Sequence, residues 1–204
     1  MKLISTTVGV AAALFTAGSA MAGPVVSLID FDHVTHAFAA PLSFYDQLHW
    51  LNFGVLAGAH ASPVGLFNSV VSTDYVAYNP DFTTYSAFYG PSFTLQDAYF
   101  GAAARDGLQL DVVGVDRHFN LIDSTSFTVD TLGPTFETFN WTNLYAVFIF
   151  ASGGTVDAAI DPGQDSTIFA LDNLRISNVV PEPGTLLLAG LGFGVLAFRR
   201  RRAA

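Results

Sequence analysis

Residues 99–115 have the sequence Tyr-Phe-Gly-Ala-Ala-Ala-Arg-Asp-Gly-Leu-Gln-Leu-Asp-Val-Val-Gly-Val. From Leu108 to Val112 apolar and polar residues alternate strictly, which is typical of a strand with one buried face. Asp106-Gly107 precedes this strand and is a favoured pair for a two-residue hairpin turn. The stretch therefore predicts a hairpin of two strands, Tyr99–Ala104 and Leu108–Val115. A helix is the alternative for the first of these, because Leu95, Ala98, Tyr99, Ala102 and Ala103 also fit helical spacing.

Further strand patterns lie on both sides of this hairpin. Val25–Asp32 places Ile29 and Phe31 on one face, and Phe127–Asp130 alternates in the same way. Tyr145–Phe150 is a continuous apolar run, which predicts a central strand covered on both faces. Ile168–Ser177 has the composition of a final strand. Gly, Pro, Asn and Asp separate these segments, so we predict an all-β fold, a single jelly-roll or β-sandwich domain over residues 23–178.

The two ends of the chain differ from this central part. Residues 1–22 have one lysine, an apolar segment and the small residues Ala20 and Ala22, which together predict a secretory signal peptide cleaved by signal peptidase. Residues 179–204 contain a proline-rich linker, an apolar segment at 185–198 and four arginines at 199–202. Fourteen helical residues span about 21 Å against a hydrocarbon core of about 30 Å, so we expect a short transmembrane helix with its arginines on the cytoplasmic side.

The order Pro181-Glu182-Pro183, short apolar helix, arginine cluster resembles the PEP-CTERM sorting signal of Gram-negative bacteria. The resemblance implies processing near these three residues by an exosortase-type membrane enzyme. It also implies a protein that is exported, anchored in the inner membrane facing the periplasm, and then passed to the cell surface or an exopolysaccharide matrix. A simple tail anchor with an incidental proline linker is the alternative.

The central part is strongly acidic and contains no cysteine. Sixteen acidic residues face three arginines there, a net charge of about −13. Such a charge repels nucleic acid and anionic membrane, and suits divalent cations, neutral glycans or solubility alone. Without cysteine, stability in an oxidising compartment depends on packing or on a bound metal.

Several segments also resemble the β-sandwich body of PEP-CTERM proteins, which is similar to jelly-roll carbohydrate-binding modules. They are Ile29–Asp32, Leu48–Phe53, Tyr75–Asn79, the Asp-Gly hairpin and Ala170–Leu174. The resemblance implies that the first and last strands lie side by side, often with a structural calcium ion near the domain edge.

Asp172 shares its strand face with apolar residues, so we expect its carboxylate to point into the core. An unpaired carboxylate there is costly. Asp30, Asp32 and Asp172 are the candidate ligands for a Ca²⁺ ion, which prefers oxygen donors. The alternative is that Asp172 accepts backbone N–H groups or pairs with a base, while Asp30 and Asp32 are solvated.

Tyrosines gather between residues 75 and 99. Aromatic rings stack on sugar faces while neighbouring polar groups bind hydroxyls. The candidate glycan-binding residues are Trp50, Tyr75, Tyr78, Asn79 and Tyr85. The alternative is that most of these rings cover the core.

The sequence contains no H-E-x-x-H and no G-x-S-x-G motif, so we predict a protein that is not an enzyme. We predict a matrix or cell-surface protein that binds polysaccharide or is embedded in it. A structural matrix protein without a specific ligand and a carboxylate-dependent glycoside hydrolase are the alternatives.

Overall fold

The computed structural model describes residues 25–34, 40–58, 64–72, 75–80, 85–160 and 166–178. All of them belong to one compact unit, Pro24–Val180. The predicted signal peptide and the predicted C-terminal helix lie outside these ranges. Among the described residues, no helix has the length and apolar character needed to cross a membrane.

The described chain is almost entirely β-structure, which confirms the predicted fold class. Its elements in chain order are β1 (Val25–Ile29), β2 (Ala40–Tyr45), β3 (Leu48–Ala57), α1 (Val64–Asn68), β4 (Tyr75–Tyr78), β5 (Ser86–Ala102), β6 (Arg105–Val115), β7 (Leu121–Val129), β8 (Thr135–Val156) and β9 (Phe169–Asn178).

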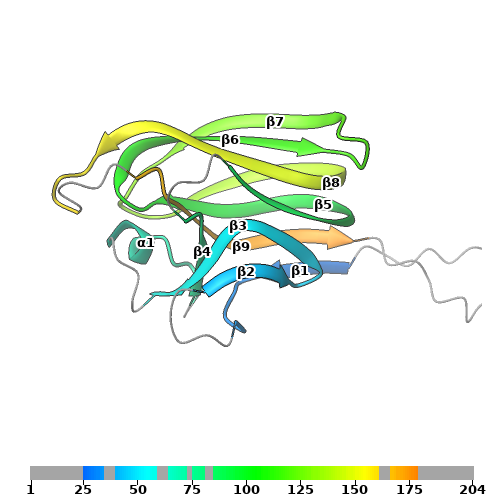
Figure 1. The fold of residues 1–204 in the computed structure, drawn as a ribbon, viewed down its shortest axis with the longest axis horizontal. Coiled ribbons are helices and arrows are strands. Elements are labelled where there is room, and N and C mark those ends of the chain that lie inside the picture. Colours follow the sequence, from blue (N-terminus) through cyan, green and yellow to red (C-terminus); the bar gives the residue numbers. More distant parts are fainter. Residues whose placement is uncertain are drawn as a thin grey trace, which may run out of the picture. The chain divides into compact units, whose positions relative to one another are not determined.

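The strands form one antiparallel sheet in the order β1-β9-β4-β3-β5-β8-β6-β7, with β2 added to β3 and a further pairing of β9 with β5. Figure 1 shows β5 to β8 next to one another, with β9 and β1 on the other side of β5. The first and last strands pair directly, Val25 with Asn178 and Ile29 with Leu174, as the sequence resemblance implied.

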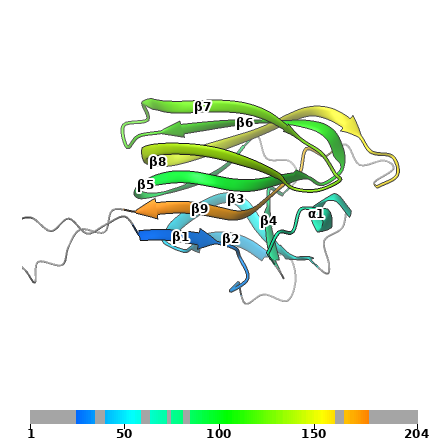
Figure 2. The ribbon, with the colours of Figure 1, turned by 180° about the vertical axis from the view of Figure 1, so that it is seen from behind.

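Two long strands, β5 and β8, take part in both layers of the sandwich. The first part of β5 pairs with β3, His49 opposite Tyr89, whereas the second part pairs with β9 from Phe93 to Ala102. The register between β5 and β8 shifts between these two parts, which is how strands bend from one layer into the other. Figure 2 shows the same two strands from behind.

The core lies between the two layers. Phe53 of β3 contacts Phe169 of β9 at a ring distance of 5.9 Å. Phe100 in the second part of β5 contacts Phe127 of β7 at 5.1 Å. The alternating pattern of β6 is confirmed, because its apolar residues Leu108, Leu110 and Val112 are fully buried.

The predicted hairpin around Asp106-Gly107 is wrong, although both of its strands exist and the helical alternative is excluded. β8 lies between β5 and β6, so these two strands have no direct pairing. Gly107 has a φ of +67° inside the paired part of β6. The carboxylate of Asp106 accepts hydrogen bonds from the backbone N–H of Thr131 at 3.0 Å and from its hydroxyl at 2.7 Å.

The apolar run Tyr145–Phe150 is central in the sheet, but it is not covered on both faces. Val147 and Ile149 point into the core. Phe148 is only half-buried, and Phe150 is 39% exposed. The run is apolar on its outer face because that face holds exposed aromatic rings, and these rings form the surface described next.

Candidate functional site

A row of aromatic rings crosses the outer face of β2, β3, β5 and β8. Phe44 contacts His49 at a ring distance of 4.9 Å, and His49 stacks on Tyr89 at 5.1 Å with 17° between the planes. Tyr89 contacts Tyr145 at 6.0 Å, and Tyr145 contacts Phe119 at 6.1 Å. Both ends of the row are open, with Phe44 60% and Phe119 65% exposed.

A second, shorter row lies beside the first on the same strands. Tyr85 contacts Phe148 at 5.7 Å and Phe150 at 5.9 Å. Strand parity explains the arrangement. Tyr89 points outward from β5, and Tyr85, directly before the strand, has the same parity, while Phe88 between them is in the core. The two rows together are called the aromatic band, which consists of Phe44, His49, Tyr85, Tyr89, Phe119, Tyr145, Phe148 and Phe150.

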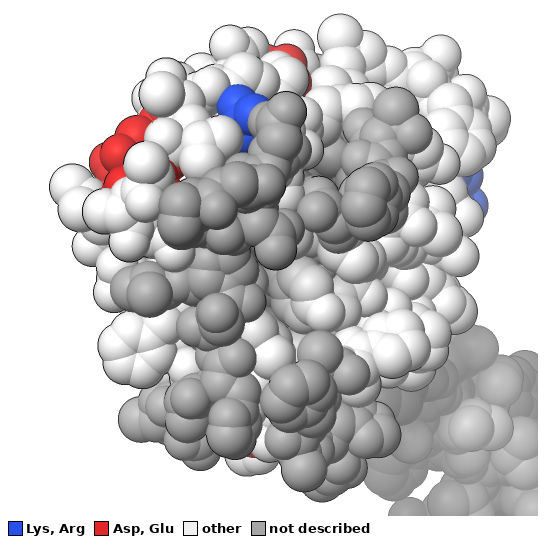
Figure 3. All heavy atoms as spheres, turned by 60° about the vertical axis from the view of Figure 1, so that its left-hand side comes forward, with Lys and Arg blue, Asp and Glu red and all other residues white. Residues whose placement is uncertain are grey.

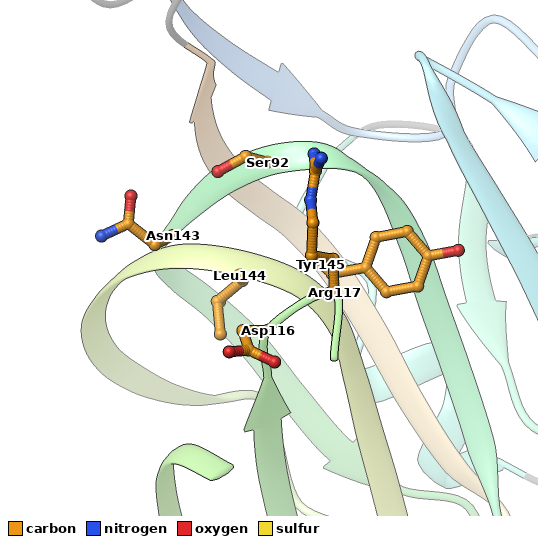
Figure 4. Close-up of a pocket in the computed structure, with 6 residues that line it drawn as sticks. All are labelled: Ser92, Asp116, Arg117, Asn143, Leu144 and Tyr145. Carbon is orange, nitrogen blue, oxygen red and sulfur yellow. The ribbon is translucent and has the colours of Figure 1, made fainter. Parts of the chain in front are cut away.

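The aromatic band ends at a cavity of about 300 Å³, which Figure 4 shows. Its lining residues are Ser92, Asp116, Arg117, Asn143, Leu144 and Tyr145. They come from the bend of β5, from the bend of β8 and from the turn between β6 and β7, so the bends in the long strands create the cavity.

Arg117 differs from the two other arginines of the described chain. Arg105 donates to the carbonyl oxygens of Gly153 and Gly154, and Arg175 pairs with Asp97. Arg117 is exposed and makes no hydrogen bond or ion pair with the described residues. Its guanidinium is therefore available as a donor at the end of the aromatic band.

The turn that presents Arg117 and Phe119 is fixed by Asp116. Its carboxylate accepts hydrogen bonds from the backbone N–H groups of His118 at 2.8 Å and Asn120 at 2.9 Å, and from the Asn120 side chain at 3.0 Å. The bonds from Asn120, followed by that from His118, lower the pKa of Asp116 below its usual value. The carboxylate stays ionised and holds the turn in one conformation.

Asp172 is fully buried, as its position on the apolar face of β9 predicted. Its Oδ2 accepts the backbone N–H groups of Val71 at 2.7 Å and Ser72 at 3.0 Å, and its Oδ1 accepts that of Asn173 at 2.7 Å. Burial raises the pKa of Asp172 to about 6, and these hydrogen bonds oppose the rise.

The three aspartates predicted to bind calcium do come together around the hydroxyl of Ser72. That oxygen lies 2.9 Å from the carbonyl oxygen of Asp30, 3.3 Å from Oδ1 of Asp32 and 3.2 Å from Oδ1 of Asp172. Within the described ranges, no three histidine, cysteine or acidic side chains are grouped closely enough to hold a metal ion. The contacts of Asp172 are those of the alternative, because its carboxylate accepts backbone N–H groups. Asp32 is not simply solvated, since its Oδ1 also accepts the backbone N–H of Tyr75 at 3.1 Å. Calcium binding stays a prediction.

Two of the predicted glycan-binding residues are buried, which corrects the prediction for them. Trp50 is 4% exposed and donates its indole N–H to the carbonyl of Tyr45. Asn79 is also 4% exposed, and its side-chain oxygen accepts the backbone N–H of Phe169. Both side chains are buried and make hydrogen bonds within the protein, so they are not accessible to a sugar.

The predicted tyrosines divide into two groups. Tyr75 and Tyr78 are half-buried and pack against the core clusters. Tyr85 lies in the aromatic band. The other members of the band were not predicted as site residues. For Tyr145, Phe148 and Phe150 the reason is that the run Tyr145–Phe150 was predicted to be covered on both faces. The outward parity of Tyr85 and Tyr89 was the signal that could have found part of it.

The predicted processing residues Pro181, Glu182 and Pro183, and the predicted cleavage residues Ala20 and Ala22, lie outside the described residues. Comparison with known families nevertheless supports the first group. Residues 179–202 match the family described as the PEP-CTERM protein-sorting motif. The chain therefore has this sorting motif, which implies an exported protein and an exosortase-type processing enzyme.

Among solved structures, a DUF4465 family protein from Bacteroides caccae has a TM-score of 0.57 at 9% identity, with 78% of this chain and 100% of that chain covered. This likeness supports the fold alone. A DUF4465 family protein from Bacteroides ovatus has a TM-score of 0.42 at 7% identity, covering 76% of this chain and 94% of that one. The carbohydrate-binding module TmCBM61 in complex with β-1,4-galactotriose has a TM-score of 0.34 at 9% identity, covering 76% and 88%. No curated protein matches the chain.

Proposed function

We propose that this exported protein is non-catalytic and binds polysaccharide along the aromatic band. The observation that supports the proposal most strongly is the unbroken series of ring contacts from Phe44 to Phe119, each step between 4.9 and 6.1 Å. Exposed aromatic rings gathered on one face mark an interaction surface, because soluble proteins seldom expose large apolar patches.

The polar groups around the band suit hydroxyl-rich ligands. The apolar C–H face of a sugar packs on a ring, while its hydroxyl groups need both donors and acceptors. Arg117 supplies donors at the cavity, and the side chains of Ser92 and Asn143 line the same space. The band therefore offers a stacking surface with a polar pocket at one end.

Charge favours a neutral polysaccharide over an acidic one. The net charge of about −13 between residues 23 and 180 opposes the approach of a polyanion. Figure 3 shows one face on which uncharged side chains cover most of the described surface. A matrix protein without a specific ligand would share this charge, but would have no need of a continuous aromatic surface.

The test is binding to an array of oligosaccharides and to the exopolysaccharide of the producing bacterium. Phe119→Ala removes an end of the band, and we expect about tenfold weaker binding, which corresponds to about 1.4 kcal/mol. The matched control is Phe67→Ala on α1, because Phe67 is 56% exposed and lies outside the band. We expect this control to bind as the parent protein does.

Equal binding by the Phe119→Ala and Phe67→Ala proteins would contradict polysaccharide binding along the aromatic band. The same samples answer the question of catalysis. We expect no new reducing ends when the protein is incubated with a polysaccharide that it binds, and their release would favour the glycoside hydrolase instead.

A further inference from the structure

A second cleft lies on the outer face of the opposite layer. It has a volume of about 390 Å³ and is lined by side chains from four neighbouring strands, β1, β9, β5 and β8. These residues, called the β9 cleft, are Leu28, Asp97, Tyr99, Phe136, Asn173 and Arg175. None of them belongs to the aromatic band, and the core separates the two surfaces.

An ion pair forms the polar side of the β9 cleft. Arg175 and Asp97 are directly opposite in the register of β9 and β5. The Nε of Arg175 donates to both carboxylate oxygens of Asp97 at 3.0 Å, and Nη2 donates to Oδ2. Asp97 is 8% exposed, whereas the Arg175 side chain is 47% exposed.

This geometry leaves part of the guanidinium available. Nε and Nη2 are occupied by Asp97, and Nη1 makes no hydrogen bond with the described residues. Because the ion pair holds the planar group in one orientation, the free N–H groups are fixed in direction before any ligand binds. The buried Oδ1 of Asn173, in the same lining, also lacks a hydrogen-bond partner among the described residues.

Aromatic and aliphatic groups form the other side. Tyr99 and Phe136 are paired across β5 and β8, and their rings are 4.9 Å apart. Phe136 is 47% exposed, and Leu28 of β1 is 55% exposed. Exposed apolar surface thus lies next to fixed donors and a carboxylate acceptor.

We propose that the β9 cleft is a second sugar-binding site, which takes a neutral hexose unit through adjacent hydroxyl groups. Adjacent hydroxyls act as donors and acceptors together, which matches the free N–H groups of Arg175 and the lone pairs of Asp97. The apolar face of the sugar packs on Phe136. A carboxylate-bearing sugar is disfavoured, because Asp97 already neutralises the charge of Arg175.

Two sites on opposite faces make the protein a bridge between polysaccharide chains. This consequence rests on the proposed function of the aromatic band, whereas the β9 cleft stands on its own residues. A bridging protein would hold a matrix together, which a protein with a single binding face cannot do.

The experiment uses the full-length chain. It is first screened against an array of short neutral glucan, galactan and mannan oligosaccharides. Calorimetry with the strongest-binding oligosaccharide gives the stoichiometry. For the parent chain we expect two oligosaccharides per protein. Phe119→Ala should weaken one of the two sites about tenfold, Phe136→Ala the other, and the double variant both. Phe136→Ala leaves the ion pair intact and removes a side chain that is 47% exposed, so we expect the fold to be retained. Phe67→Ala is the control.

The outcomes separate the two proposals. A single site that Phe119→Ala weakens and Phe136→Ala leaves unchanged overturns the β9 cleft and keeps the aromatic band. A single site with the opposite response keeps the cleft and overturns the band. No binding to any neutral oligosaccharide overturns both. Bridging is checked by light scattering, where we expect the parent protein, and neither single variant, to aggregate a long neutral polysaccharide that it binds.

Discussion

Asp172 shows what a single residue reveals in sequence and what it conceals. Its parity with the apolar residues of β9 predicted an inward carboxylate, and the side chain is fully buried. Its hydrogen-bond donors could not be predicted, because Val71 and Ser72 lie about a hundred positions earlier in the chain. Only the folded arrangement shows that backbone N–H groups satisfy this carboxylate.

The raised pKa of Asp172 predicts a specific pH dependence of stability. A folded-state pKa of about 6, above the ordinary value, means that this group contributes most to stability at low pH and that its contribution is lost as pH rises through about 6. Between pH 7 and pH 5 the parent protein should gain about 1 kcal/mol relative to Asp172→Asn. Urea unfolding of both proteins at the two pH values measures this difference.

Asp172→Asn should also be less stable than the parent by about 1–3 kcal/mol, since an amide cannot accept all the N–H groups that the carboxylate accepts. A difference between the two proteins that stays constant from pH 7 to pH 5 would contradict the pH prediction, because other titrating groups act equally in both.

Calcium binding by Asp30, Asp32 and Asp172 is tested separately. A ligand that binds only the folded protein raises the melting temperature. If calcium binds, the thermal midpoint in millimolar Ca²⁺ should exceed the midpoint in chelator. An unchanged midpoint would contradict calcium binding. The three aspartates would then be joined through the hydroxyl of Ser72 alone.

At the scale of elements, strands were predictable and their partners were not. Alternation located β6 and β7, and composition located β9. The Asp106-Gly107 pair suggested a local hairpin, but β8 enters between β5 and β6 from more than thirty residues later in the chain. The hydrophobic pattern of a strand shows which face is buried, and it contains no information about which strand lies beside it.

The short helix α1 packs tightly against the end of β5. A Cβ atom at Gly65 would overlap the carbonyl oxygens of Ala102 and Ala103, which are backbone atoms and cannot rotate away. Gly65→Ala should therefore destabilise the protein by about 1–3 kcal/mol. Chemical unfolding provides the measurement.

Gly133→Ala is the control for that substitution. An added Cβ at Gly133 has no atom within 4 Å, so its effect should be close to neutral. Equal stability of the two variants would show that α1 can move away from β5 without cost.

At the scale of the whole molecule, the aromatic band illustrates the limit of sequence reasoning. Trp50 and Phe119 are both aromatic residues near strand ends, yet the first is buried and the second is 65% exposed. Trp50 lies on the inward face of β3, whereas Phe119 lies in the turn between β6 and β7, so aromatic character alone does not separate them. The sorting motif, in contrast, is a continuous stretch and could be predicted from its residues alone.

We propose that the sorting motif directs cleavage near Pro181-Glu182-Pro183 and transfer to the cell surface or matrix. Replacing all three residues by alanine should leave the protein in the membrane fraction with its arginines at 199–202 intact. Mass spectrometry of the C-terminus in each cell fraction tests this. A parent protein with its full C-terminus in the cytosol would contradict the proposed route.

The position of β9 has a mechanical consequence for a protein tethered by its C-terminus. β9 lies between β1 on one side and β4 and β5 on the other, and the chain leaves it at Asn178. If the proposed transfer leaves the protein attached by its C-terminus, tension from a ligand on one of the proposed binding faces would act along β9, and its hydrogen bonds to several strands would share the load in shear. Such a domain should withstand flow better than one whose last strand lies at an edge and can be peeled away.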